Sequence, residues 1–251
     1  SSGGLLPRVA AARAKVAGSG GPEPVLLDAG DALFPSAVVS QLTAEAAPAK
    51  ALVAALKTAR YDALAVGDAT LAASKSLLAT VLGAARDAEL PMIASNLACP
   101  AEDAPAGCAV GAAGSTANQA LFERGGVKIG VLNVLPQSLG DEVTPGVLAG
   151  AEFAAPAEVT QTRVKALRSE GADLVVLVSN LDEPSTAPRL TLELVQGLAE
   201  DGRPDVVITA ATGRVVVSLQ AASGVPVLAA APGVLGRAAL RYPDEHDRAL
   251  A

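Results

Sequence analysis

Residues 171–181 read GADLVVLVSNL, a stretch typical of one strand of a parallel β-sheet. Val and Leu fill nearly all of 173–179 without the polar alternation of a half-exposed strand, so both faces of the strand are expected to be covered. A helix is predicted just before it, at 156–169, and Gly171 is the kind of residue that ends a helix. A second helix is predicted at about 186–200. This order of helix, strand and helix indicates an α/β fold.

The same alternation of short apolar runs and helical stretches extends along the chain. The pair Gly125-Gly126 separates two apolar runs and predicts a β-hairpin over 118–134. We interpret the chain as one α/β domain covering residues 1–251, with two β-rich halves that suggest a two-sheet sandwich flanked by helices. The other predicted strands are 25–31, 63–66, 91–96, 206–209, 215–219, 225–230 and one near 235–241, and the other predicted helices are 48–60 and 71–89.

The composition excludes several classes of protein. Apolar residues make up 51% of the 251 residues, which rules out intrinsic disorder. The net charge of −7 argues against nucleic-acid binding, because affinity for the phosphate backbone needs clustered Lys and Arg. The single histidine, His246, excludes a His-rich zinc or di-metal centre built from this chain alone. Its place in a charged stretch near the C-terminus also disfavours a Ser-His-Asp triad.

Two cysteines give an indication of the cellular compartment in which the protein works. Cys99 and Cys108 lie in a stretch rich in Ala, Pro and Gly, and we expect a disulfide that closes a surface loop, which would indicate an oxidising compartment. The alternative is two free thiols in a cytosolic loop. No stretch is long and apolar enough to predict a transmembrane segment. The abrupt start Ser1-Ser2-Gly3-Gly4 is compatible with a mature or trimmed N-terminus of an exported protein.

Polar residues follow most of the predicted strands, at the sheet edge where α/β proteins gather ligand sites. Carboxylates and amides that converge there could hold a hard cation such as Mg²⁺ or Ca²⁺. The alternative is that Asp and Asn are good turn formers after a strand. Arg214 and Arg237 lie beside glycines and could accept an anion, although loop arginines are more often solvated. The polar residues at the strand ends are Asp28, Asp31, Asp68, Asn96, Asn180, Asp182, Glu183 and the segment 209–214.

Eight stretches of the chain occur in the order found in a known family. The stretch 25–36 (VLLDAGDALFPS) is similar to a strand ending in DAGD and a later GS, and 61–70 (YDALAVGDAT) stands where the family has YDA and then GNHE. The stretch 171–181 is similar to a strand ending in SHL, and 205–213 (DVVITAATG) to one ending in GGHTH. Shorter similarities cover 3–8, 92–97, 127–132 and 224–240. The chain thereby resembles the catalytic domain of the calcineurin-like metallophosphoesterases, in the branch of the bacterial periplasmic 5′-nucleotidases and UDP-sugar hydrolases.

The resemblance implies a four-layer α/β/β/α fold and a two-metal site that activates water against a phosphorus ester. Asp31 stands where the family has a metal-bridging aspartate. The other implied positions are altered, and the family's opening strand with its D-x-H ligands would precede Gly3. Asp68 stands in place of an asparagine ligand, and Ala69 stands in place of the histidine that contacts the reacting phosphate. Asn180 replaces a histidine ligand, and Ala211 and Gly213 replace the two histidines of GHTH. Ala and Gly cannot replace imidazole as a ligand, so the resemblance implies a pseudoenzyme.

The resulting prediction is a non-catalytic, 5′-nucleotidase-like domain that acts in binding or assembly of an exported, periplasmic or extracellular protein. Its partner would be another protein or further domains of a larger chain. No cofactor is expected apart from a single Mg²⁺ or Ca²⁺ ion held by Asp31 and Asp68. The alternative is a residual phosphoesterase that uses one oxygen-liganded metal ion. The candidate residues of the vestigial cleft are Asp31, Asp68, Asn96, Asn180 and Arg214.

Overall fold

The strand predicted at 173–179 is β9 (Leu174–Ser179), which lies inside a sheet. The computed structural model describes residues 5–20, 22–30, 33, 46–98, 116–139, 152–182, 188–210 and 217–230. Within these residues β9 pairs in parallel with β7 (Val127–Val134) on one side and with β10 (Val206–Ala210) on the other. The residues from Val175 to Val178 are all buried, which confirms a strand covered on both faces.

Among the described residues, this larger sheet has six strands in the order β11-β12-β10-β9-β7-β6. Strand β12 (Pro226–Ala230) runs parallel to β10, whereas β11 (Val217–Gln220) runs antiparallel to β12. At the other edge, β6 (Ala120–Arg124) forms the predicted hairpin with β7. Its two turn residues, Gly125 and Gly126, have φ of 59° and 79°, the positive values that a tight hairpin turn requires.

A second sheet comes from the N-terminal half of the chain. In the described residues its order is β1-β2-β3-β5, and every pairing is parallel. Two further short strands, β4 (Leu97–Ala98) and β8 (Glu152–Phe153), form an antiparallel pair. The strands of the second sheet are β1 (Leu27–Asp28), β2 (Ala63–Ala65), β3 (Met92–Ile93) and β5 (Thr116–Ala117).

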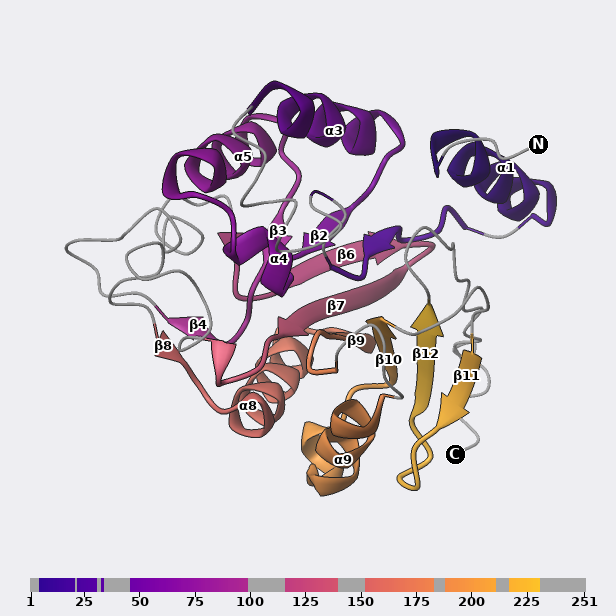
Figure 1. Ribbon diagram of the computed structural model, residues 1–251. Helices are drawn as coiled ribbons and strands as arrows, with labels where there is room; N and C mark the ends of the chain where they lie inside the picture. Colours follow the sequence, from indigo (N-terminus) through magenta and orange to yellow (C-terminus); the bar gives the residue numbers. More distant parts are fainter. Residues whose placement is uncertain are drawn as a thin grey trace.

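Helices cover the outer face of each sheet (Figure 1). Helices α3 (Ala46–Thr58) and α5 (Lys75–Asp87) pack on the smaller sheet, and α8 (Pro156–Ser169) and α9 (Arg189–Gly197) pack on the larger one. The bounds of α8 match the predicted helix. Gly171, with φ of 90°, follows its end, where the N–H of Ala172 donates to the carbonyl of Leu167 at 2.9 Å. The remaining helical segments are α1 (Leu5–Gly18), α4 (Asp68–Leu71) and η1 (Glu200–Gly202).

The helix predicted at 71–89 is wrong as a single element. The structure has α4, a break, and then α5, because Ser74 caps the second helix by accepting a hydrogen bond from the N–H of Leu77 at 3.4 Å. The helix predicted at 186–200 is shorter, since α9 begins after Pro188. The strand predicted at 91–96 is also shorter, because only β3 falls within it and β4 begins after its end. The strand predicted near 235–241 lies outside the described residues.

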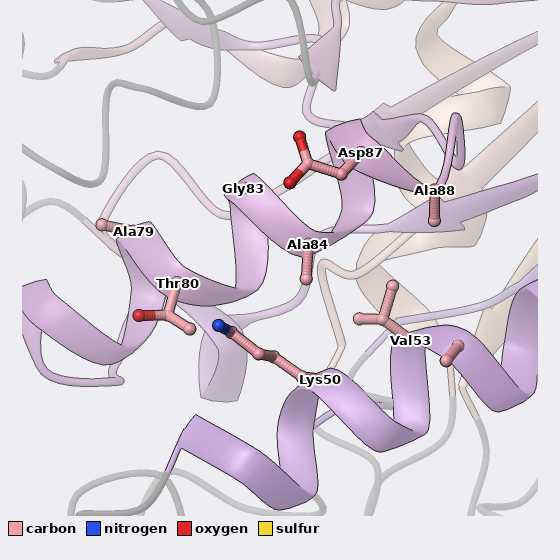
Figure 2. Close-up of a pocket in the computed structure, with 9 residues that line it drawn as sticks. Lys50, Val53, Ala79, Thr80, Gly83, Ala84, Asp87 and Ala88 are labelled. Carbon is pink, nitrogen blue, oxygen red and sulfur yellow. The ribbon is translucent and has the colours of Figure 1, made fainter.

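Helices α3 and α5 leave a groove of about 460 Å³ on their outer side. Lys50 and Val53 on α3 face Thr80 and Ala84 on α5 across this groove (Figure 2). The groove lies on the helical layer, away from the ends of the strands. None of the described helices combines the length and the hydropathy needed to cross a bilayer.

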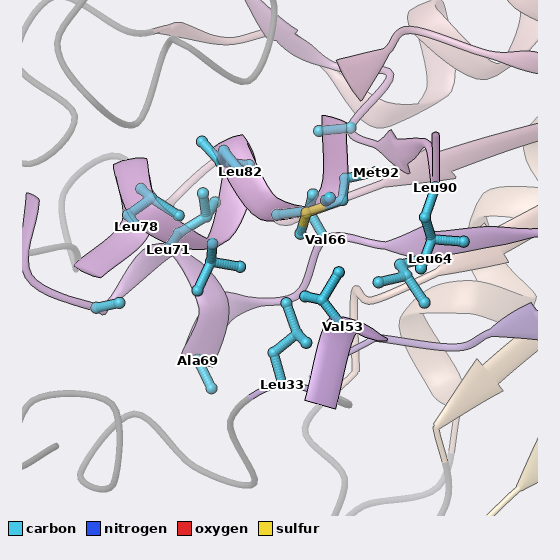
Figure 3. Packing of buried hydrophobic residues seen from close by; sticks show 14 of the residues in the cluster. Leu33, Val53, Leu64, Val66, Ala69, Leu71, Leu78, Leu82, Leu90 and Met92 are labelled. Atoms are coloured by element: carbon cyan, nitrogen blue, oxygen red, sulfur yellow. The ribbon is translucent and has the colours of Figure 1, made fainter. Parts of the chain in front are cut away.

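The core has three layers of apolar side chains. One lies between the smaller sheet and its helices, where Val53, Leu64, Val66, Leu82 and Met92 are all buried (Figure 3). A second lies between the larger sheet and α8 and α9. The third joins the two sheets face to face, and successive residues of a strand alternate between layers, as in β9. The architecture is therefore helix, sheet, sheet, helix, as expected.

Candidate functional site

Asn133 of β7 lies where the strands of the two sheets end. It shares a face of β7 with Val131, which packs between the sheets, and its exposed fraction is 0%. Its side-chain Nδ2 donates to the carbonyl of Val66 at 2.9 Å and to that of Ile93 at 2.7 Å. These carbonyls belong to the carboxyl ends of β2 and β3, so one amide of the larger sheet binds two strands of the smaller one.

Ser95 strengthens the same junction. The backbone N–H of Ser95 donates to the carbonyl of Asn133 at 2.8 Å, and the N–H of Asn133 donates to Ser95 Oγ at 2.9 Å. Together with the side-chain bonds, these contacts join the segment after β3 to β7 in both directions. The junction is polar but closed to solvent, because Ser95 and Asn133 are both buried.

Asn180 follows β9 and continues the polar contacts towards β1. Its Nδ2 donates to Asn133 Oδ1 at 2.8 Å, and its backbone N–H donates to the carbonyl of Val134 at 2.9 Å. The side chain lies against Gly30, where a Cβ atom would stand 2.3 Å from Asn180 Oδ1. Gly30 also has φ of 117° and donates its N–H to Asp28 Oδ2 at 3.1 Å. Glycine is therefore required where β1 approaches β9.

Asn96 is held by the protein on both ends of its amide. Its Nδ2 donates to the carbonyls of Leu135 at 2.8 Å and Ala154 at 3.1 Å, and its Oδ1 accepts the N–H of Leu135 at 3.0 Å. The residue is 2% exposed. A ligand at Asn96 would have to displace these bonds, so the geometry gives this side chain a structural part at the strand ends.

Asp68 is the first residue of α4 and comes two residues after Val66, whose carbonyl binds Asn133. Its side chain is exposed at the same sheet edge. The next residue, Ala69, is buried in the core beside Leu33 and Leu71 (Figure 3). Of the pair at 68–69, the carboxylate of Asp68 alone offers a side-chain ligand atom.

A negative charge at β1 also acts on its neighbour Tyr61. Burial raises the pKa of the Tyr61 hydroxyl to about 12, and the charge of Asp28 acts in the same direction. Both causes favour the protonated phenol. Tyr61 therefore stays neutral and does not add a charge to the strand ends at physiological pH.

Asp182 belongs to a helix cap. Its carboxylate accepts the N–H groups of Leu190 at 2.7 Å and Thr191 at 2.9 Å, at the start of α9, and the hydroxyl of Thr191 at 2.6 Å. Thr191 Oγ1 also lies 2.7 Å from Ser179 Oγ. The strand-end carboxylate considered for a cation is thus engaged by the first turn of a helix.

Several predicted residues cannot be located. Asp31, Arg214, Cys99 and Cys108 lie outside the described residues, as do Glu183, Ala211, Gly213, Arg237 and His246. The disulfide and the roles of Asp31 and Arg214 stay predictions.

The donors at the described strand ends do not fit a di-metal centre with imidazole ligands. They are the exposed carboxylate of Asp68, the partly buried carboxylate of Asp28 and the amides of Asn96 and Asn180, of which Asn96 is fully hydrogen-bonded. Within the described parts of the chain, no three His, Cys, Asp or Glu side chains lie close enough together to hold a metal ion. Oxygen donors of this kind suit a hard cation better than a transition metal.

The sequence reasoning missed Asn133. The available indication was a lone asparagine inside the apolar run VLNVL at 131–135, because a polar residue in a buried strand must find partners. The places of Asn180 and Asn96 after strands predict both as site residues, and the structure brings Asn180 next to Asn133.

No protein-family model and no curated protein sequence matches the chain. Solved structures do match. The precursor of a 5′-nucleotidase from Thermus thermophilus superposes with a TM-score of 0.64 at 20% identity, over 91% of this chain and 43% of that one. The NAD nucleotidase of Haemophilus influenzae gives a TM-score of 0.65 at 16% identity, over 90% of this chain and 42% of that one. This chain thus spans less than half the length of either protein.

The calcineurin-like phosphoesterase YfkN from Bacillus subtilis gives a TM-score of 0.66 at 13% identity, over 91% of this chain and 72% of that one. At sequence identities this low, the superpositions show similarity of fold only. The resemblance seen in the sequence motifs is confirmed at that level, and the chain has the α/β/β/α fold shared by the calcineurin-like metallophosphoesterases and the 5′-nucleotidases.

Proposed function

We propose that the chain is a non-catalytic, 5′-nucleotidase-like domain that acts in the binding or assembly of an exported protein. The observation that carries the proposal is the position of Asn180. The family resemblance implies a histidine ligand at this place, but the Asn180 amide donates to Asn133 Oδ1 and packs against Gly30. Its nitrogen is a hydrogen-bond donor with no lone pair for a metal ion, so a cation here would have to bind the amide oxygen, which lies against Gly30.

Two further observations support the loss of catalysis. Ala69, at the implied phosphate-contacting position, is buried among apolar side chains and has no group to stabilise a transition state. The chain also contains one histidine in total, so the nitrogen ligands of a two-metal site cannot be drawn from it.

In this proposal the old cleft keeps a binding role for an anionic group or a single Mg²⁺ or Ca²⁺ ion. The candidate residues are Asp31, Asp68, Asn180 and Arg214, with Asp31 and Asp68 as the cation ligands. Asn96 shapes the cleft, because its amide is fully hydrogen-bonded to the backbone. The partner is another protein or further domains of a longer chain, and the place of action is periplasmic or extracellular, with Cys99 and Cys108 joined in a disulfide.

Phosphate release from 5′-nucleotides, measured with added Mg²⁺, Mn²⁺ or Zn²⁺, tests the proposal together with metal analysis of the purified protein. We expect release at the rate of the blank and contents of Zn, Mn and Fe well below one ion per chain. The variant Asp31→Asn is expected to match the wild type in this assay. Asp87→Asn, which changes an exposed carboxylate on α5, is the control for charge alone.

Metal-dependent release that Asp31→Asn abolishes and Asp87→Asn leaves intact would overturn the proposal. It would instead establish a residual phosphoesterase that works with one oxygen-liganded ion.

A further inference from the structure

The amides of Asn133 and Asn180 form a continuous hydrogen-bonded bridge between the two sheets. Asn180 donates to Asn133 Oδ1, and Asn133 Nδ2 donates to the carbonyls of Val66 and Ile93. Both N–H donors of the Asn133 amide and its oxygen are thereby used. A buried amide without partners costs about 2–7 kcal/mol, so a complete set of bonds is what makes this residue acceptable between two sheets.

The bridge lies at one end of the inter-sheet core. Towards the middle of the sheets, the neighbouring positions are apolar and pack face to face, with Val131, Val176 and Val178 opposite Ala63, Ala65 and Ile93. At the carboxyl ends, the apolar contact is replaced by Asn133 and its hydrogen-bond partners. Hydrogen bonds have directions and fixed lengths, whereas apolar contacts do not, so the bridge sets the distance and register of the strand ends.

We propose that this amide bridge holds the carboxyl ends of the two sheets together without a metal ion. The described donors there do not fit the di-metal centre that the fold family implies, and the bridge supplies the cross-link between β2, β3, β7 and β9 from neutral groups. Neutral groups carry no charge that must be desolvated or balanced. The geometry of these strand ends is therefore independent of metal.

This inference goes beyond the proposed function, because it concerns what holds the strand ends and not what the cleft does. Two measurable results follow. In buffer without added Mg²⁺ or Ca²⁺, a chelator leaves the thermal midpoint of unfolding unchanged, and the two asparagines contribute to that midpoint as a coupled pair.

Thermal unfolding of the whole chain, followed by circular dichroism, tests both statements. The samples are the wild type with and without EDTA, Asn133→Ala, Asn180→Ala, the double variant, and the exposed residue Asn118→Ala as the control. We expect no shift with EDTA and none for Asn118→Ala. Asn180→Ala should lower the midpoint by about 4 °C and Asn133→Ala by about 10 °C, with the double variant lowering it by clearly less than the sum.

Asn133→Ala could prevent folding, so Asn180→Asp supplies a second comparison. A carboxylate at 180 cannot donate to Asn133 Oδ1 and repels it, and this variant should be less stable than Asn180→Ala at neutral pH. Three results would each overturn the bridge: a midpoint that falls by several degrees in EDTA in buffer without added Mg²⁺ or Ca²⁺, additive effects of the two asparagines, or Asn180→Asp as stable as Asn180→Ala. Phosphoesterase activity would overturn the proposed function and leave the bridge intact, so the two failures are distinguishable.

Discussion

Gly30 has a positive φ and no room for a side chain, and it lies where β1 meets the residue after β9. The backbone conformation is one that residues with a Cβ rarely adopt. The space that the missing Cβ leaves is filled by the Asn180 amide. A single glycine thus permits the close approach of two chain segments that come from different sheets.

Gly30→Ala is expected to lower the free energy of unfolding by about 1–3 kcal/mol, because it adds both backbone strain and a clash with Asn180. Urea unfolding measures this loss. Gly83→Ala is the matched control: Gly83 lies inside α5 with open space around it, so alanine there should stabilise the protein by about 0.5–1 kcal/mol. If both substitutions changed the free energy of unfolding equally, the requirement for glycine at position 30 would be contradicted.

The titration of Tyr61 should be visible in the stability of the protein. Its pKa is raised from 10.0 to about 12 by burial and by Asp28. In the unfolded chain the phenol loses its proton near its ordinary pKa, whereas the folded protein keeps it. Since the folded state then binds more protons than the unfolded state, stability falls as pH rises through this interval.

The free energy of unfolding should therefore decrease by about 2–3 kcal/mol more in the wild type than in Tyr61→Phe between about pH 10 and pH 12. Urea unfolding at a series of pH values measures the difference between the two proteins. Parallel pH profiles would show that Tyr61 titrates normally.

At the scale of elements, helix α9 depends on a residue outside its own bounds. Asp182 accepts the backbone N–H groups of Leu190 and Thr191, which no carbonyl within the helix can reach. Its carboxylate also meets the positive end of the helix dipole. The loop after β9 is in this way attached to the helix that covers the larger sheet.

Asp182→Ala should cost about 2 kcal/mol of stability, because it leaves these donors without their acceptor in a buried setting. Denaturant unfolding followed by circular dichroism checks the value. The control on the same helix is Glu193→Ala, which removes an exposed i,i+4 ion pair with Arg189 and should change stability by at most about 0.5 kcal/mol. If Glu193→Ala lost as much stability as Asp182→Ala, the role of Asp182 as the cap of α9 would be contradicted.

At the scale of the whole molecule, small side chains decide how closely the two sheets approach. Ala63 and Ala65 of β2 face Val131, Val176 and Val178 of the larger sheet. Such an interface is packed at the density of a protein interior and has little spare volume. Aromatic residues, which make up 2% of the chain, contribute little to this layer.

Ala65→Leu is accordingly expected to destabilise the protein by about 1–3 kcal/mol, since the added side chain must push the sheets apart. The same change at Ala54, an exposed residue of α3, should stay within about 0.5 kcal/mol. Thermal or urea unfolding measures the stability of the Ala65→Leu and Ala54→Leu variants against the wild type. A tolerated leucine at 65 would mean that the sheets are not in close contact there.

The parts of the fold that the sequence predicted well are those with strong local patterns. Helix α8, the hairpin around Gly125-Gly126 and the buried strand β9 each occupy the predicted residues. The helix predicted at 71–89 was wrong because its apolar period continues through the break, and a single serine cap at Ser74 divides it. For the site, the sequence shows that Asn180 follows a strand, but it does not show the hydrogen-bond partners of Asn96.

The sequence by itself determined the fold class, the kind of each major element and the scarcity of histidine, because periods of 2 and 3.6 residues and composition are local properties. Only the tertiary structure decided what the strand-end amides contact. The carbonyls that bind Asn133 belong to residues 67 and 40 positions away, in the other sheet. Such contacts depend on which sheets stack and in which register, and no local pattern carries that information.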